Sequence, residues 1–132
     1  MYKLGKQSMK NLVGVHPLIA FAVYRAIERT KQDFTVFEGV RTTARQKHLF
    51  DEGVSKTLDS YHLYGLAVDL VAIVNGKPTW EEKYYGEIRK AVTEVCKAYQ
   101  IPLENGFDLW GWDMPHWQLT GMKSEYDVRQ LA

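Results

Sequence analysis

The sequence predicts an α+β fold, a single domain with a small central antiparallel sheet flanked by helices. Two long segments carry apolar residues at helical spacing, and two others carry the β-branched and aromatic residues typical of strands. The connections between these segments are irregular, which argues against repeated βαβ crossovers and therefore against a parallel sheet. A length of 132 residues fits one domain, so we expect a single unit over residues 1–132.

The first third of the chain predicts two helices and a strand. A short helical piece is expected over residues 8–13. A longer helix follows from Pro17 to about Thr30, and Pro17 suits its first turn because the missing N–H is not needed there. Residues 33–41 (DFTVFEGVR) then read as a strand, in which simple alternation places Glu38 on the apolar face.

A short helix and a loop are expected next. Thr42 or Thr43 can cap a helix over residues 44–52, and Gly53 can end it. Residues 54–65 show little periodicity, so we expect a loop there.

The second half contains the clearest strand. Residues 66–74 (LAVDLVAIV) are apolar almost throughout, and the dipeptide Asn75-Gly76 predicts a tight turn directly after them. A second long helix is expected over residues 81–99 because apolar residues follow one of its faces. Residues 103–119 are rich in Gly and Trp and predict a pair of short strands joined by a loop.

Composition excludes several classes of protein. The chain has 17 Lys+Arg against 16 Asp+Glu, and this near balance gives no sign of a nucleic-acid partner. Its single cysteine, Cys96, allows neither an internal disulfide nor a cysteine-rich zinc cluster. The longest apolar run, over residues 18–23, is far shorter than the ~20 residues that span a bilayer, so no membrane insertion is expected.

An aspartate inside the strand over residues 66–74 is the most informative residue. Both faces of this strand are otherwise apolar, and such strands are normally covered on both sides. An unpaired carboxylate at Asp69 would therefore be costly. Asp69 must be paired with a cation, protonated or bound to a metal ion, and the strand alone leaves these three possibilities open.

Two histidines can join Asp69 as metal ligands. His62 precedes it in the chain, and a glycine between them allows a sharp bend, although a solvated loop side chain is the alternative. His116 follows Pro115 in an extended segment and shares a strand face with Gln118, although it can equally be a core histidine bonded to a backbone carbonyl. Two imidazoles and one carboxylate form the ligand set of a catalytic zinc ion whose fourth position is left to water.

Two further residues can supply chemistry beside such a site. Asp113 lies just before His116, and a carboxylate there can accept a proton from water and pass it to a leaving amine. The alternative is an ordinary turn aspartate. Arg41 can aim its guanidinium into the same cleft and oppose a substrate carboxylate or an oxyanion. The alternative is a surface salt bridge to Glu38 or Asp51.

Three motifs occur together in a fixed order, namely EGVRTTARQ, S-x-H-x-x-G-x-A-x-D and D-x-x-H. The second motif is met by Ser60, His62, Gly65, Ala67 and Asp69, and the third by Asp113 and His116. In these motifs, over roughly residues 15–119, the chain resembles the zinc D-Ala-D-Ala / L-Ala-D-Glu peptidases, and in particular the small endolysins of bacteriophages. The resemblance implies the hedgehog/DD-peptidase fold, an α+β domain with a central antiparallel sheet.

The resemblance also implies roles for individual residues. It implies that Zn²⁺ is bound by His62, Asp69 and His116. It implies that Asp113 is the catalytic base and that Arg41 holds the substrate or the transition state. Additional substrate-binding or supporting residues are expected at Gln46, Ser55, Lys56 and Ser60.

The activity implied by the resemblance is zinc-dependent hydrolysis of peptidoglycan stem peptides, with the L-Ala–D-Glu bond as the expected target. The alternatives are a D-Ala-D-Ala carboxypeptidase, which uses the same ligands, and a non-catalytic zinc-containing domain that binds the cell wall. As for phage endolysins, we expect synthesis in the host cytoplasm without a signal peptide and action on the bacterial wall during host cell lysis. We also expect a monomer without a separate wall-binding domain.

One segment departs from the family pattern. Family members often carry W-G-G-D-W before the D-x-x-H motif, whereas this chain has Gly106, Asp108 and Trp110 at a different spacing. The aromatic residues nearby, Trp110, Trp112 and Trp117, can bind glycan or pack the core, and core packing is expected for Trp117.

Overall fold

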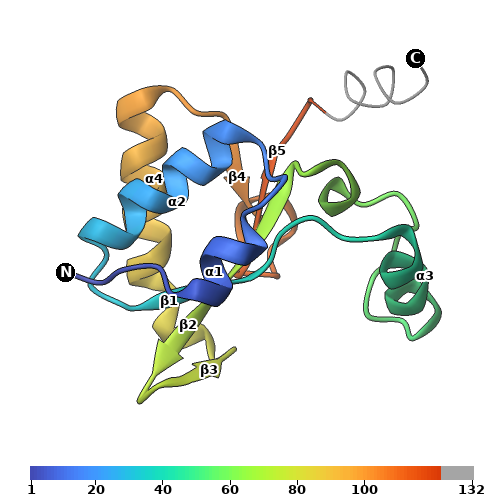
Figure 1. Ribbon diagram of the computed structural model, residues 1–132, viewed down its shortest axis with the longest axis horizontal. Coiled ribbons are helices and arrows are strands. Elements are labelled where there is room, and N and C mark those ends of the chain that lie inside the picture. The colour runs from blue at the N-terminus through green and yellow to red at the C-terminus, as the bar shows by residue number, and fades with distance from the viewer. Residues whose placement is uncertain (123–132) are drawn as a thin grey trace.

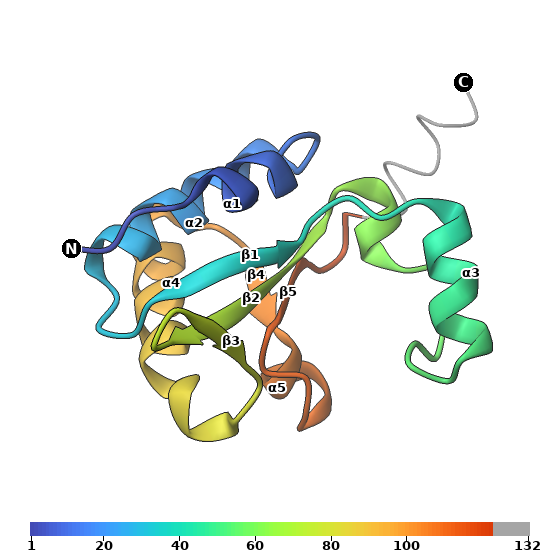
Figure 2. The same ribbon diagram turned by 60° about the horizontal axis from the view of Figure 1, so that its bottom comes forward.

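The computed structural model describes residues 1–122, which form a twisted sheet with helices packed against it (Figures 1 and 2). The strands are β1 (Phe34–Glu38), β2 (Ala67–Val74), β3 (Lys77–Thr79), β4 (Leu103–Asn105) and β5 (His116–Leu119). The α-helices are α1 (Lys6–Asn11), α2 (Pro17–Arg29), α3 (Thr43–Asp51), α4 (Gly86–Tyr99) and α5 (Gly106–Trp110). Two short 3₁₀ helices are η1 (Tyr61–Tyr64) and η2 (Glu82–Tyr84).

The sheet is antiparallel throughout, as the sequence predicts. Its strands follow the order β1-β2-β5-β4, and β3 forms a hairpin with the C-terminal half of β2. Strand β2 is therefore central, with β1 along one edge and with β5 and β3 sharing the other. The α+β fold with a small antiparallel sheet is confirmed.

The hydrophobic core lies between one face of the sheet and helices α2 and α4. Alternate residues of β2 point into it, and Val68, Leu70 and Ala72 are fully buried, as is Leu66 directly before the strand. Trp117 of β5 is also buried there, which confirms its expected place in the core. The opposite face of β2 carries Asp69, so the residue that does not suit a core lies outside it.

Helix α1 covers the outer edge of β1. Ser8 Oγ accepts a hydrogen bond from the backbone N–H of Val36, and Asn11 Nδ2 donates to the carbonyls of Val36 and Phe37. An exposed sheet edge offers unpaired backbone groups to other chains. These side-chain bonds satisfy the edge of β1 close to where the strand ends.

A β-bulge changes the face on which Glu38 lies. The register pairs Val36 with Leu70 but Glu38 with Asp69, so two residues of β1 oppose one residue of β2. Directly paired residues lie on the same face of a sheet, and an extra residue reverses the alternation. The prediction that Glu38 lies on the apolar face is therefore wrong, because the bulge moves it to the face of Asp69.

Three other details differ from the sequence prediction. The stretch expected as a loop over 54–65 contains η1, which forms because Ser60 Oγ accepts from the N–H of His62. The expected loop between the last two strands contains α5, whose N-terminus is capped by Asn105 Oδ1. The long helix begins at Gly86 instead of residue 81, because residues 82–84 form η2.

Apart from the short strand β3, which the sequence does not predict, the remaining elements follow the prediction closely. Helix α3 is capped by Thr42, whose hydroxyl accepts from the N–H of Arg45. None of the helices within residues 1–122 is long and apolar enough to cross a membrane. The expected single domain extends to residue 132, and its last ten residues, 123–132, lie outside the described part of the chain.

Candidate metal centre and active site

Three polar side chains lie in a row across the sheet and line a pocket. Asp69 of β2 is in register with Glu38 of β1 on one side and with His116 of β5 on the other. Cross-strand partners in a sheet have their Cβ atoms only ~4.5–5.5 Å apart. Strand pairing thus places an acid, a second acid and a histidine side by side, although they are far apart in the sequence.

His62 reaches the same point from η1. Its Nδ1 lies 2.9 Å from the carbonyl oxygen of Gly39, so Nδ1 carries the proton and donates it there. The other nitrogen, Nε2, lies 3.3 Å from Asp69 Oδ1. Gly65 ends η1 with a φ of 69°, and a Cβ there would lie 2.5 Å from the carbonyl oxygen of Gly14. Glycine is therefore required where the chain turns from His62 into β2.

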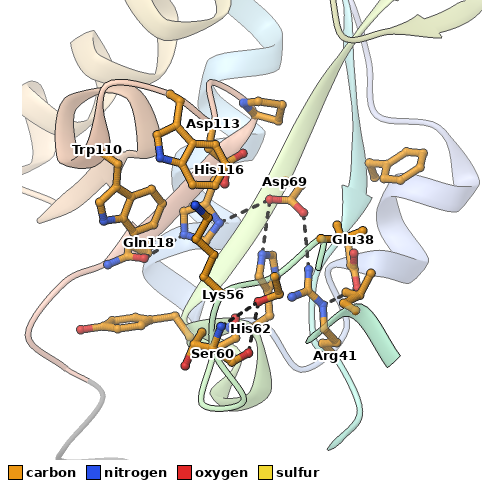
Figure 3. Close-up of a pocket in the computed structure, with 18 of the residues that line it drawn as sticks. Glu38, Arg41, Lys56, Ser60, His62, Asp69, Trp110, Asp113, His116 and Gln118 are labelled. Atoms are coloured by element: carbon orange, nitrogen blue, oxygen red, sulfur yellow. Dashed lines mark hydrogen bonds and ion pairs between the residues drawn. The ribbon is translucent and has the colours of Figure 1, made fainter. Parts of the chain in front are cut away.

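His116 is oriented by a side chain of its own strand. Its Nε2 lies 2.8 Å from Gln118 Oε1, and Gln118 Nε2 donates in turn to Thr120 Oγ1 at 3.1 Å. This arrangement gives the proton to Nε2 and leaves Nδ1 free, 3.4 Å from Asp69 Oδ1. Figure 3 shows His62 and His116 converging on Asp69 from two sides.

The three donor groups fit a tetrahedral metal ion. Ligand atoms ~2.0–2.1 Å from a zinc ion and separated by the tetrahedral angle lie ~3.3 Å apart. The two nitrogen-to-Asp69 Oδ1 distances of 3.3 and 3.4 Å match this spacing, and ligand atoms of all three residues lie within 4.8 Å of one another. Each histidine also donates its other ring N–H to an oxygen, as metal-bound histidines generally do. The structure thus brings together His62, Asp69 and His116 in an arrangement that can hold a divalent metal ion.

The site favours an ionised carboxylate on Asp69. Burial alone would raise the pKa of Asp69, but the adjacent His62 and His116 outweigh it and hold this pKa well below its usual range. Burial alone would lower the pKa of His116, but its hydrogen bond to the Asp69 carboxylate outweighs burial and raises this pKa. Asp69 is thus surrounded by groups that favour its ionised form.

Arg41 lies on the other side of Asp69 (Figure 3). Its Nε donates to Glu38 Oε1 at 2.6 Å, and one terminal nitrogen, Nη1, donates to Gln46 Oε1 at 2.7 Å. The other terminal nitrogen, Nη2, lies 3.7 Å from Asp69 Oδ2. The ion pair with Glu38 named as an alternative is therefore present, but it is part of the pocket wall, and the guanidinium faces the candidate metal centre as well.

The other expected substrate-binding residues lie at different depths. Gln46 is fully buried behind Arg41, and its amide nitrogen donates to Ser55 Oγ and to the carbonyl of Thr57. Ser55 and Ser60 both line the pocket, with Ser60 also capping η1. Gln46 therefore positions Arg41 and the 55–57 loop from behind and does not line the pocket.

A strained turn carries Asp113. Its φ of 64° is left-handed, a conformation that Asp and Asn adopt more readily than most residues with a side chain. A Cβ on Gly106 would lie only 2.3 Å from the carbonyl oxygen of Asp113, so glycine alone fits at the start of α5. Asn105 Nδ2 donates to the carbonyls of Met114 and His116 and fixes the same turn. Gly106 and Asn105 thus support the turn that carries Asp113.

The Asp113 side chain is half-buried and lies beside His116 on the pocket wall (Figure 3). Burial raises the pKa of this carboxyl, and the nearby charge of His116 only partly opposes that effect. A raised pKa makes a carboxylate a better proton acceptor near neutral pH. Its position and its pKa therefore suit an exchange of protons with a molecule in the pocket.

The pocket itself has a volume of about 870 Å³ and runs past the candidate metal centre. Trp110 lies along the His116 ring with a centroid separation of 5.3 Å, and Trp112 lies 6.0 Å from Trp110. Phe37 and Trp80 form an edge-to-face pair that also lines the pocket. Exposed aromatic walls around convergent polar groups are typical of ligand-binding sites.

Sequence reasoning missed four contributors to this site. Gln118 was placed on the His116 face without a role, and the two-residue spacing on one strand was the signal that could have indicated one. Glu38 was assigned to the wrong face because a bulge is not visible in simple alternation. The roles of Gly39 and Asn105 depend on contacts between distant segments, and no local pattern marks them.

Known proteins with similar sequences and structures share one description. A sequence model of the family described as phage L-alanyl-D-glutamate peptidase matches residues 1–120. The L-alanyl-D-glutamate peptidase of Escherichia phage T5 is 33% identical over 111 residues, which cover 81% of each chain. The peptidase of the same name from Listeria phage A118 is 35% identical over 86 residues, which cover 64% of this chain and 30% of the relative.

Among solved structures, the Serratia marcescens L-Ala D-Glu endopeptidase ChiX superimposes with a TM-score of 0.83 at 38% identity. The match covers 92% of this chain and 91% of ChiX. The extent of these matches and the shared fold lead to one conclusion: the chain belongs to the phage L-alanyl-D-glutamate peptidase family.

Proposed function

We propose that this peptidoglycan peptidase is a zinc enzyme that hydrolyses the L-Ala–D-Glu bond of the stem peptide. The observation that carries the proposal is the convergence of His62 Nε2 and His116 Nδ1 on one oxygen of Asp69, with each imidazole held through its other nitrogen. The names of the related peptidases support the choice of bond. Residues that would hold the zinc ion are His62, Asp69 and His116.

Zinc bound by these residues would act as a Lewis acid toward the scissile carbonyl and would lower the pKa of water toward ~7. Asp113, on the pocket wall beside His116, would take a proton from the attacking water and return it to the amino group of the departing D-Glu. A pKa raised by burial suits both steps, because the group must gain and lose the same proton.

Arg41 would oppose negative charge that develops on the substrate during attack. Its Nη1 donates to Gln46 Oε1, whereas Nη2 lies 3.7 Å from Asp69 Oδ2, which is longer than a hydrogen bond. Nη2 would therefore be the group that donates to an oxygen of the substrate in the pocket. Glu38 and Gln46 would hold the guanidinium in place, while Ser55 and Ser60 would contact the bound peptide from the same wall.

The setting that we propose is host cell lysis by a monomeric phage endolysin. The protein would be made in the host cytoplasm and would act on the bacterial wall. The whole of the proposed catalytic apparatus lies within one domain, and we propose no nucleic-acid partner.

Metal content and wall hydrolysis, measured on the same sample, test the proposal. The purified protein should hold about one zinc ion per chain, lose wall hydrolysis on chelation and regain it when zinc is returned. His116→Ala should lower both quantities. Its control is replacement of the exposed His48, which lies in α3 and pairs with Glu52 and should change neither quantity. Equal hydrolysis by metal-free and zinc-loaded protein would refute zinc dependence.

Mass spectrometry of digested stem peptides tests which bond is cut. Cleavage between L-Ala and D-Glu should leave the D-Ala–D-Ala bond intact. Release of free D-Ala with an intact L-Ala–D-Glu bond would instead identify a D-Ala-D-Ala carboxypeptidase. Binding to the wall without any cleavage by the zinc-loaded protein would identify a non-catalytic wall-binding domain.

A further inference from the structure

The cations that line the pocket are not equally available to a ligand. Arg41 contacts Glu38, Gln46 and Asp69, so its charge is already opposed by two carboxylates. Arg45 lies 3.8 Å from Glu38 Oε1. Within residues 1–122, Lys56 is the remaining cation of the pocket wall, and no carboxylate of the described residues lies within salt-bridge distance of it.

The Lys56 side chain points into the site. It comes from the loop between α3 and η1, and its Nζ lies 5.8 Å from the centroid of the Trp112 ring. Figure 3 shows the side chain extending toward His116 and Asp113, on the opposite side of Asp69 from Arg41. The aromatic ring holds the ammonium group by a cation–π contact without neutralising its charge. The result is a positioned cation in the same pocket as the residues that would carry out hydrolysis.

The proposed substrate requires a cation near the cleaved bond. A glutamyl residue has two carboxyl groups, and the peptide chain uses only one of them to continue. The D-Glu residue that follows the scissile bond therefore brings a free carboxylate into the pocket. The acidic residues Asp59, Glu82 and Asp113 also line this pocket and would repel that group. An unopposed ammonium is the wall group best suited to receive it.

We propose that Lys56 binds the free carboxylate of the D-Glu residue and thereby sets the substrate preference of the enzyme. This inference rests on the proposed function and extends it from the bond to the recognition of the residue after it. It also orients the peptide, with the D-Glu side over Lys56 and Trp112 and the L-Ala side toward the Phe37–Trp80 pair at the other wall.

The test compares two short peptides on the zinc-loaded enzyme. One is L-Ala–D-Glu–L-Lys, in which the D-Glu carboxylate that forms no peptide bond is free. In the other peptide this carboxylate is converted to a carboxamide. A charge-assisted hydrogen bond predicts a kcat/KM about 10- to 100-fold higher for the carboxylate peptide in the wild type. Lys56→Met should reduce the ratio to within about twofold, mainly through KM, and Lys56→Arg should restore most of it.

Controls separate this inference from the proposed function. Lys97→Met, an exposed position on α4 away from the pocket, should keep the wild-type ratio. Calorimetry on the metal-free protein should show the same preference in binding, without any need for catalysis. If the zinc-loaded wild type cuts neither peptide, the proposed function fails, whereas a binding preference that Lys56→Met removes still supports the role of Lys56.

Three results would overturn the inference alone. The first is a Lys56→Met variant that cuts both peptides and keeps the wild-type ratio. The second is an equal loss on both peptides, which would mean that Lys56 only supports the aromatic wall. The third is a loss of the preference in Arg45→Met but not in Lys56→Met. That result would place the substrate carboxylate at Arg45, which lies close to Glu38.

Discussion

The two faces of β2 differ sharply in what they are built to do. The face toward α2 and α4 contributes Val68, Leu70 and Ala72 to the core, and all three are inaccessible to solvent. The other face carries Asp69 in register with His116 and, through a bulge, with Glu38. One strand therefore supplies both the packed scaffold and the central ligand of the candidate metal centre.

The difference shows how the site gains its precision. Alternate residues of β2 are held by close packing, so the residues between them have little freedom to shift. Asp69 inherits this rigidity without lying in the core, since its side chain keeps a fifth of its surface exposed. We expect changes on the core face to affect stability and changes on the open face to affect metal binding and catalysis.

The largest effect is expected from Asp113→Asn on the open face. The amide cannot accept the proton of the attacking water, so kcat should fall by about 10²- to 10⁴-fold. Asn tolerates the left-handed backbone of this position, so the fold and the zinc content should be unchanged. Wall hydrolysis and zinc content of the same preparation check this.

Asp108→Asn is the matched control for this prediction. Asp108 is an exposed acid in α5, and it pairs with Arg89. Its replacement should leave kcat within about twofold, because a surface pair of this kind contributes little. Unchanged turnover in Asp113→Asn would remove Asp113 from the mechanism.

The next effect is expected from Leu70→Ala on the core face. A leucine-to-alanine change at a fully buried site lowers the free energy of unfolding by about 2–5 kcal/mol. Turnover by the zinc-loaded protein should stay within about twofold at temperatures where it remains folded. Urea unfolding and single-temperature kinetics measure the two quantities.

Leu18→Ala, at an exposed position in the first turn of α2, is the control and should cost well under half as much. A loss of turnover in Leu70→Ala that matched its loss of stability would show that the two faces are not independent. Packing changes at Leu70 would then reach its neighbour Asp69 in β2 directly.

The smallest effect is expected from Gln118→Ala. Removal of the amide leaves His116 Nε2 without its acceptor and frees the imidazole to rotate. Loss of such a supporting group typically weakens metal affinity by about 10- to 100-fold. Competition with a zinc chelator measures this, and kcat at saturating zinc should change less than the affinity.

Gln7→Ala provides the comparison, because the Gln7 side chain donates to Asn11 on the exposed side of α1. An affinity in Gln118→Ala equal to that of Gln7→Ala would show that β5 alone orients His116. The open face would then need no support from residues beyond the three ligands.

Local patterns were sufficient to predict most elements. The helix from Pro17 and the strand around Asp69 are strongly periodic, and their predicted bounds lie within one residue of the observed ones. The weaker elements η1 and α5 were missed because single caps from Ser60 and Asn105 start them without any apolar period. The resemblance to the zinc peptidases identified ligands that periodicity alone left among several possibilities.

The amino-acid order by itself determined the kinds of group available. These are one acid in an otherwise apolar strand, two histidines, and a glycine that allows the chain to bend between His62 and Asp69. It could not determine that the charge of Arg41 is paired with the Glu38 carboxylate while Lys56 contacts the Trp112 ring. These contacts join distant segments through a bulge and a loop. Charge and hydrogen-bonding capacity belong to each residue, whereas the partner that uses them is decided only when sheet register and loop packing bring distant residues together.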